Sequence, residues 1–228
     1  MARPAKPLHE ARFPNESADY RHARDALLGA EIALRRQIEA VAAQRRALPP
    51  GGAVREDYEF VEGENARRVR LSAMFGEKST LLIYNFMYGP KMEHACPACT
   101  SILDSLDGAA VPFGQMASLA VVAKSPIRRI RDFAKERGWT RLRLLSSADN
   151  SYNADYHGED AKGEQMPMLN VFKRRGDSIL HTYSTELRLV PSDPGQDPRH
   201  VDSIWPLWSL LDFTPDGRGE FHPSLHYD

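Results

Sequence analysis

The chain has 228 residues, of which 42% are hydrophobic and 27% are charged, and these fractions are typical of a globular protein with a core of its own. Its 30 Lys and Arg residues are balanced by 31 Asp and Glu residues, so the formal net charge is −1. This composition excludes disorder as the general state, and the balanced charge argues against a nucleic-acid partner. The apolar runs are too short to span a bilayer, so we expect no membrane partner either.

The N-terminal part predicts a loose arm followed by one long helix. Residues 17–48 contain no Pro and a single Gly, and Ser17 can cap the first turn. The Pro-Pro-Gly-Gly sequence at residues 49–52 should end the helix. Apolar side chains recur within it at a spacing of seven residues: Leu27, Leu34, Val41 and Leu48. Such a narrow stripe is typical of a helix that packs against another helix or a domain surface, and it favours a homodimer.

The rest of the chain alternates between strand and helix signals. In chain order, the pattern predicts a hairpin over 54–71, a buried strand over 80–87, a helix over 97–107, a second buried strand over 117–123, a helix over 125–137 and a short strand over 142–145. A polar stretch over 149–166 then precedes a hairpin over 168–183, a Pro-rich loop over 191–200 and a last helix over 201–211. In the helix over 125–137, Ser125 is the expected N-cap and Pro126 the first helical residue.

These elements indicate the fold class and the domain organisation. The alternating half requires parallel strands joined by crossover helices, whereas the hairpin requires antiparallel strands. We therefore expect an α/β fold with a mixed central sheet and helices on both faces. Residues 1–52 should form the N-terminal arm and long helix, and residues 53–228 the α/β domain.

The only two cysteines of the chain lie close together, in Cys96-Pro97-Ala98-Cys99. Two cysteines cannot form a disulfide scaffold, and a reducing compartment such as the cytoplasm leaves them free for redox chemistry. Cys96 lies where a helix should begin, so free N–H groups and the helix dipole favour its thiolate. Because Cys99 lies one helical turn further on, it can form a disulfide with Cys96. The spacing indicates Cys96 as the nucleophile and Cys99 as the resolving thiol.

Other interpretations of the pair remain open. The cysteines can be two small buried hydrophobic residues, or half of a metal site completed by His94 and one of His157 or His181. The strand–helix–strand context favours redox chemistry over a metal site, and we expect no cofactor. His94, two residues before Cys96, can stabilise the thiolate or can be an exposed loop residue beside Glu93.

Further residues are candidates for a substrate site. Pro167 follows Met166 immediately before the first strand of the predicted hairpin. Pro is permitted at the start of a strand, so it can also mark that boundary without any functional role. Aromatic residues can wall a groove beside the thiols, although in core strands such residues usually serve packing. These are Tyr84, Phe86, Tyr88 and Tyr183.

The Cys-x-x-Cys after the first core strand, together with residues 166–177, resembles the thioredoxin fold, in which a cis-proline opens the antiparallel hairpin. This resemblance implies a cis Met166-Pro167 bond that places the Met166 backbone beside the Cys pair as a substrate clamp. A closer resemblance is to the bacterial thioredoxin-like family called domain of unknown function 899. It rests on residues 86–90, 96–99, 149–153, 181–185 and 210–218. It covers about residues 17–219 and implies the fold and the placement of the cysteines more than a substrate.

The chain departs from two related families. Thioredoxins carry Trp before the first Cys and Gly-Pro between the pair, where this chain has Ala and Pro-Ala. Peroxiredoxins, which residues 125–147 also resemble, use a Pro and a hydroxyl before the reactive Cys and an Arg at the start of a strand. Here Glu93 occupies the hydroxyl position and Met166-Pro167 begins the strand, so two of these three supports for peroxide reduction are missing.

Together these observations predict a cytoplasmic, thioredoxin-like dithiol/disulfide oxidoreductase. Cys96 and Cys99 are its expected catalytic residues. The expected substrate-binding residues are Met166, Pro167, Tyr88 and His94. The expected partner is a protein or a low-molecular-weight thiol or disulfide. A peroxiredoxin-type thiol peroxidase and a non-catalytic binding or scaffold protein are the alternatives.

Overall fold

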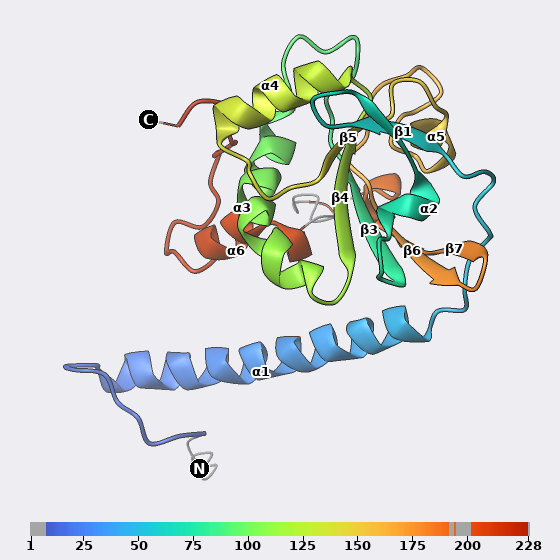
Figure 1. Ribbon diagram of the computed structural model, residues 1–228. Coiled ribbons are helices and arrows are strands. Elements are labelled where there is room, and N and C mark those ends of the chain that lie inside the picture. Colours follow the sequence, from blue (N-terminus) through green and yellow to red (C-terminus); the bar gives the residue numbers. More distant parts are fainter. Residues whose placement is uncertain (1–7, 192–193, 195–201, 228) are drawn as a thin grey trace. The chain divides into compact units, whose positions relative to one another are not determined.

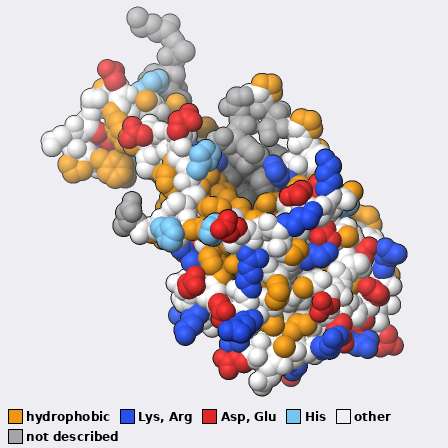
Figure 2. Space-filling model, turned by 90° about the horizontal axis from the view of Figure 1, so that it is seen from above, with side chains coloured by type: hydrophobic (Ala, Val, Ile, Leu, Met, Phe, Trp, Pro, Cys, Tyr) orange, Lys and Arg blue, Asp and Glu red, His pale blue; other side chains and the backbone are white. Residues whose placement is uncertain are grey.

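The computed structural model describes residues 8–191, 194 and 202–227. The chain divides into two compact units, Met1–Pro49 and Pro50–Asp228, close to the boundary that the sequence predicts after residue 52. No helix in the described part of the chain is long and apolar enough to cross a membrane. In Figure 2, Lys and Arg side chains are intermingled with Asp and Glu side chains over the visible face.

The first unit is built around helix α1 (Ala18–Ala47). Ser17 caps this helix, because its side-chain oxygen accepts the N–H of Tyr20 at 3.1 Å. Arg45 and Arg46 lie in the last turn, where positive charge complements the helix dipole. The long N-terminal helix predicted from the sequence is confirmed.

The second unit is built on a seven-stranded mixed sheet within the described residues (Figure 1). Its strands are β1 (Glu59–Glu62), β2 (Arg67–Arg70), β3 (Thr80–Asn85), β4 (Ser118–Ala123), β5 (Leu144–Ser146), β6 (Leu169–Arg175) and β7 (Ser178–Ser184). They lie in the order β2-β1-β5-β4-β3-β6-β7. Strands β3, β4 and β5 run parallel to one another, and the other neighbouring pairs are antiparallel.

Helices cover both faces of this sheet (Figure 1). They are α2 (Leu71–Met74), α3 (Pro97–Gly114), α4 (Ile127–Arg137), α5 (Tyr152–Asp155) and α6 (Pro206–Leu211). Apolar residues of α3, α4 and α6 form one cluster, here called the α3-side core, and those of α2 and α5 form the α2-side core. Successive strand residues face opposite sides, so β3 contributes Tyr84 to the α3-side core and Ile83 to the α2-side core.

The order β3-α3-β4-α4-β5, followed by the β6–β7 hairpin and α6, is a thioredoxin-like arrangement. The predicted α/β fold class, with a mixed sheet between two helical layers, is therefore confirmed. The arrangement places the Cys-x-x-Cys at the start of α3, after the loop that follows strand β3.

Some element boundaries differ from the prediction. Helix α3 extends to Gly114 because Ala109 and Ala110, both strong helix formers, carry it past residue 107. The last helix, α6, begins at Pro206, which fits the first turn of a helix, and Asp202–Ile204 forms a separate 3-10 turn, η2. Val201 and most of the predicted loop over 191–200 lie outside the described residues.

Strand β5 also begins later than predicted, at Leu144. The carboxylate of Asp107 on α3 accepts the backbone N–H groups of Arg141 and Leu142 at 2.8 and 3.1 Å. These two N–H groups are therefore used by a side chain of α3 and not by a neighbouring strand.

Candidate active site at the Cys96–Cys99 pair

Cys96 is the N-cap residue of α3, and Pro97 occupies the first helical position. The first turn is well defined, because the backbone N–H and the side-chain hydroxyl of Thr100 both donate to the Cys96 carbonyl at 2.9 Å. The Cys96 N–H donates to the Met87 carbonyl at 3.0 Å. This carbonyl fixes the start of the helix against the end of β3, with the Cys96 side chain at the positive end of the helix dipole.

The two thiols are free, and they differ sharply in exposure and charge. Cys96 is half-buried, whereas Cys99 is 1% exposed. A hydrogen bond from the Cys99 thiol, helped by the backbone N–H groups of Cys99 and Ala98 and opposed by burial, lowers the pKa of Cys96 to about 6. The hydrogen bond to Cys96, burial and the negative charge of Cys96 together raise the pKa of Cys99 well above its ordinary range. At neutral pH the pair therefore holds a thiolate on Cys96 and a thiol on Cys99.

This asymmetry decides which of the two thiols is ready to react. A thiolate is the form of cysteine that attacks a disulfide, and its reactivity requires access from solvent, which the half-buried Cys96 has. Cys99 is buried, and it keeps its proton while Cys96 carries the negative charge. The geometry therefore supports attack by Cys96 followed by resolution by Cys99.

Arg188 is a residue near the site that could not be found from the sequence. It lies in the 3-10 turn η1 (Leu187–Leu189), which follows β7, and its positive charge also lowers the pKa of Cys96. No motif or spacing links this Arg to the Cys pair in the sequence. The fold brings it there, because β6 pairs with β3, and β7, which leads into η1, pairs with β6.

The loop between β3 and α3 is held by the start of α4. The guanidinium of Arg129 donates to the carbonyls of Gly89 and Glu93 at 3.2 and 2.8 Å, and also to the carbonyl of Met92. Ser125, predicted to be a helix cap, instead donates its hydroxyl proton to the Tyr88 carbonyl at 2.6 Å, and Pro126 is the N-cap residue of α4. These contacts position the loop that leads into Cys96.

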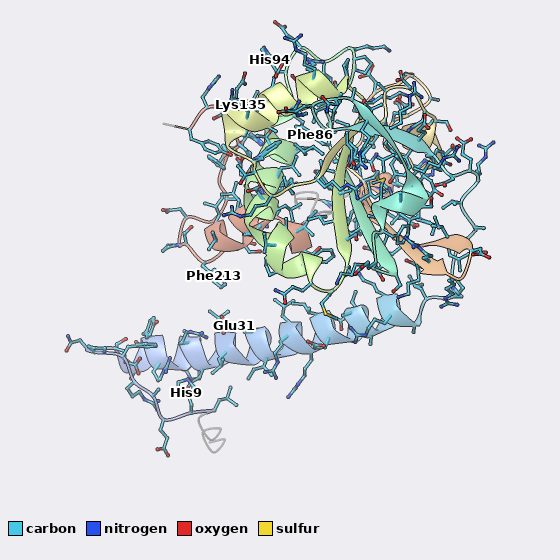
Figure 3. The ribbon with its side chains drawn as sticks, viewed as in Figure 1. His9, Glu31, Phe86, His94, Lys135 and Phe213 are labelled. Carbon is cyan, nitrogen blue, oxygen red and sulfur yellow. The ribbon has the colours of Figure 1, made fainter. Side chains whose placement is uncertain are left out.

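Tyr88 and His94, two predicted substrate-binding residues, lie in this loop with different surroundings. The Tyr88 ring is buried below the Arg129 guanidinium, 4.1 Å away, and contacts Phe86 and Phe133. The His94 side chain is 73% exposed and lies 3.8 Å from the Glu93 carboxylate. Figure 3 shows His94 at the surface, whereas Phe86 lies inside the unit. The structure therefore places Tyr88 in the packing of the loop, and it shows no contact between His94 and the thiols among the described residues.

The segment around Met166 and Pro167 lies against the same loop, but not as predicted. The cis Met166-Pro167 bond implied by the thioredoxin resemblance is absent, because every described peptide bond is trans. The trans isomer is the intrinsically favoured one. The Met166 N–H donates to the Gly158 carbonyl at 2.9 Å. Contact with the loop is made through Gln165, whose side chain fills the space where a Cβ of Gly89 would lie.

Tyr84 lies directly behind Cys99 in the α3-side core. It is fully buried on β3, and its hydroxyl interacts with the Cys99 sulfur. The sequence indicated Tyr84 only as a possible wall of a groove. Its place beside Cys99 follows from the sheet register, which pairs it with Val121 on one side and Leu169 on the other.

The histidines that could complete a metal site do not gather around the thiols. His181, on β7, bonds Asn170 at 3.1 Å and contacts Phe172 of the α2-side core. Within the described part of the chain, no group of three or more His, Cys, Asp or Glu side chains could hold a metal ion.

A spacious surface cavity, of about 660 Å³, lies apart from the thiols. It is lined by the turn between β1 and β2 and by residues of α4 and the segment that follows it. Its charged side chains are largely paired with one another, as in Arg131 with Glu64 and Arg143 with Glu62. The cavity therefore offers mostly neutralised charges, and neither cysteine lines it.

Several solved structures are similar to this chain, at low sequence identity. Peroxidoxin BcpB from Mycobacterium tuberculosis is 18% identical with a TM-score of 0.46, and the match covers 72% of this chain and 98% of that one. A peroxiredoxin-like protein from Aquifex aeolicus is 13% identical with a TM-score of 0.45, covering 72% and 88%. A mutant of peroxiredoxin Q from Xanthomonas campestris is 15% identical with a TM-score of 0.46, covering 69% and 98%.

Comparison with curated proteins finds no match. The family model described as "Bacterial protein of unknown function (DUF899)" matches residues 10–227. Because this match spans nearly the whole chain and includes both units, the chain belongs to that bacterial family.

Proposed function

We propose that this protein is a thiol–disulfide oxidoreductase that acts in a reducing compartment such as the cytoplasm. The observation that carries the proposal is the pairing of a half-buried thiol of lowered pKa, Cys96, with a buried thiol of raised pKa, Cys99, one helical turn away. An attacking thiol works best when its pKa lies near the ambient pH, and the pKa of Cys96, about 6, approaches that condition.

The reaction has two thiol–disulfide exchange steps. The Cys96 thiolate attacks one sulfur of the substrate disulfide, so a Cys96–substrate disulfide forms and the first substrate sulfur leaves as a thiolate that takes up a proton. Cys99 then loses its proton and attacks the Cys96 sulfur, which forms the Cys96–Cys99 disulfide and releases the second substrate thiol. The substrate gains two electrons and two protons, and an external dithiol reductant restores the protein.

The segment that ends at Pro167 is the proposed contact for an extended substrate. It lies against the loop that leads into Cys96, through Gln165 and Gly89. The Met166 N–H already donates to Gly158, so the Met166 carbonyl is the group we propose for pairing with a substrate N–H. Such pairing would suit a protein or a peptide-like thiol as the substrate.

A thiol peroxidase is the second candidate function, and one observation favours it. The positive charge of Arg188 acts on Cys96 and could also act on a bound peroxide. Efficient peroxide reduction further requires groups that polarise the O–O bond. The hydroxyl position of peroxiredoxins is Glu93 in this chain, and its side chain is 89% exposed. Because disulfide exchange requires no such polarising group, it is our first proposal.

A mixed-disulfide experiment tests the proposal with three proteins. Wild type, Cys99→Ser and Cys96→Ser are each reduced and then mixed with a chromogenic aromatic disulfide, and the products are identified by mass spectrometry. We expect wild type to release both aromatic thiols and to end with a Cys96–Cys99 disulfide. Cys99→Ser should release one thiol and keep the other on Cys96, and Cys96→Ser should react slowly.

The outcomes separate the three functional classes. Inert thiols in folded wild type would reject the proposal in favour of a binding or scaffold protein. Oxidation of Cys96 by hydrogen peroxide orders of magnitude faster than that of free cysteine would favour the peroxidase. A rate close to that of an ordinary thiolate is the expected result.

A further inference from the structure

Tyr84 carries a buried hydroxyl that interacts with the Cys99 sulfur. The residue is 0% exposed, and its hydroxyl has no hydrogen bond of standard geometry with any described residue in the dithiol state. Buried polar groups in proteins are nearly always hydrogen-bonded, so a core hydroxyl without a well-formed hydrogen bond calls for an explanation.

The side chain that acts most directly on this hydroxyl is Cys99, through a hydrogen bond and its charge, and the more remote charge of Cys96 adds to the effect. Tyr84 and Cys99 belong to the same core cluster, whose other described members are apolar or aromatic side chains. The interaction with Tyr84 acts on Cys99 by lowering the pKa of its thiol, and the backbone of Met87 acts in the same direction. Both groups therefore favour a negative charge on a sulfur that carries none in the dithiol state.

Burial raises the pKa of Tyr84 well above its ordinary value, so the phenol keeps its proton at any physiological pH. A protonated phenol can donate a hydrogen bond to a thiolate. In the dithiol state Cys99 uses its own proton to donate to the Cys96 thiolate, so it presents no negative charge to Tyr84.

We propose that Tyr84 is a catalytic residue of the resolving step: its hydroxyl donates a hydrogen bond to Cys99 when that sulfur becomes a thiolate. The proposal rests on the disulfide exchange proposed above. The exchange mechanism also explains why Cys99 becomes reactive only after the mixed disulfide has formed on Cys96. In the dithiol state, the negative charge of Cys96 and the hydrogen bond that it accepts from Cys99 keep the proton on Cys99. Both are lost once Cys96 is joined to the substrate, so Cys99 can then lose its proton.

The proton balance of this step is simple. Cys99 gives up its own proton to solvent, and the departing substrate thiolate takes one up. The electron pair of Cys99 forms the new bond to the Cys96 sulfur, and the bond between Cys96 and the substrate breaks. Tyr84 keeps its proton throughout, because it acts only as a donor, together with the Met87 N–H, to the sulfur that carries the transient charge.

Replacing Tyr84→Phe tests this role, because it removes one oxygen and leaves the ring in the core. In single-turnover reactions with the chromogenic disulfide, the first thiol should be released at the wild-type rate. The second release should be slower by about tenfold to a hundredfold, the range expected for loss of a hydrogen bond to a charged group. The mixed disulfide on Cys96 should accumulate, and the pH profile of resolution should move to higher pH.

Tyr152→Phe is the matched control. Tyr152 is also fully buried, and its hydroxyl likewise makes no hydrogen bond of standard geometry, but it lies in the α2-side core, away from the thiols. This variant should resolve at the wild-type rate. Tyr84→Leu also lacks the hydroxyl donor and should slow resolution in the same way. It replaces Tyr84→Phe in the test if that variant does not fold.

The outcomes distinguish the two proposals. If wild type forms no Cys96–Cys99 disulfide, the proposed function fails. If wild type forms it and Tyr84→Phe resolves at the same rate with the same pH profile, the role of Tyr84 is overturned. Equal slowing by Tyr84→Phe and Tyr152→Phe would likewise overturn it, because the effect would then belong to core packing in general.

Discussion

At Cys96, the charge of the thiolate depends most on a single neighbour, the thiol of Cys99, which donates a hydrogen bond to it. The two residues thus share one proton, which stays on Cys99 while Cys96 is negative. Because of this coupling, the pKa of each thiol depends on the other thiol. Removing one of them should change the titration of the one that remains.

Cys99→Ala should raise the pKa of Cys96 from about 6 toward the ordinary cysteine value of about 8.5, because the principal donor to its thiolate is lost. The pH dependence of alkylation by iodoacetamide, followed by mass spectrometry, measures this change. Wild type should alkylate fastest at Cys96, with a midpoint near 6. Equal, slow alkylation of both sulfurs in wild type would contradict the assignment of roles.

The lowered pKa of Cys96 also links stability to pH. An acid whose pKa is lower in the folded state stabilises the fold above its unfolded pKa, about 8.5 for Cys, and this contribution is lost as pH falls through the folded value. The free energy of unfolding of the reduced protein should therefore contain a part that declines from about pH 8.5 toward about 6. Urea unfolding at a series of pH values measures this part, and Cys96→Ser should lack it.

Arg188 acts on the same thiolate only through its charge, and it is exposed to solvent. Arg188→Gln should therefore raise the pKa of Cys96 by less than Cys99→Ala does, and the difference from wild type should shrink in high salt. Alkylation profiles at low and high ionic strength measure the effect. Arg175→Gln, an exposed Arg at the far end of β6, is the control and should leave the profile unchanged. A salt-independent effect of Arg188→Gln would indicate a structural role instead.

At the scale of elements, Asp107 connects the middle of α3 to the segment that precedes β5. Its carboxylate accepts two backbone N–H groups, from Arg141 and Leu142, and forms an ion pair with Arg141 at 3.3 Å. This single side chain fixes where the chain enters β5 after α4.

Asp107→Ala should lower the free energy of unfolding by about 3 kcal/mol, because two backbone N–H groups lose a charged acceptor in a partly buried setting. Urea unfolding followed by circular dichroism measures the change. Asp132→Ala, which removes an exposed carboxylate paired with Arg128 within α4, should lower it by less than about 1 kcal/mol. Equal losses in the two variants would show that the Asp107 contacts do not hold the segment.

The sequence predicts those elements whose determinants are local. Strands β3 and β4 follow from unbroken apolar runs, and the start of α3 follows from Cys96-Pro97, because Pro fits the first turn of a helix. The ends of elements are less predictable. Where β5 begins depends on Asp107, which is remote in sequence from that strand.

The Cys pair can likewise be found from its spacing, but the groups that tune it cannot. Arg188 and Tyr84 approach the thiols through sheet register and through the β6–β7 hairpin, which no local pattern reveals. The residue type of Ser125 and its position before Pro126 predict a cap for α4. The Tyr88 carbonyl competes successfully for the Ser125 hydroxyl, and only the fold brings that carbonyl near.

For the whole molecule, the apolar stripe of α1 needs a surface to cover it. The exposed fractions of Leu27 and Leu34 are 52% and 60%, and Ile38 on the same face is also exposed. Burying a Leu side chain contributes about 1.5 to 3 kcal/mol, so a row of them at a spacing of seven residues strongly favours a partner surface. The spacing matches that of helices that pair in a coiled coil, and symmetric dimers are the commonest assemblies.

We therefore propose that α1 pairs with the same helix of a second chain. Light scattering should show a dimer for the full-length protein and a monomer for a chain that begins at Pro50, which retains both cores of the second unit. Leu27→Glu combined with Leu34→Glu should also give a monomer, because charge on the stripe opposes its burial. Arg36→Glu, on the opposite face of α1, is the matched control and should remain dimeric. A monomeric full-length protein would reject the pairing, whereas a dimer that survives removal of α1 would place the interface within residues 50–228.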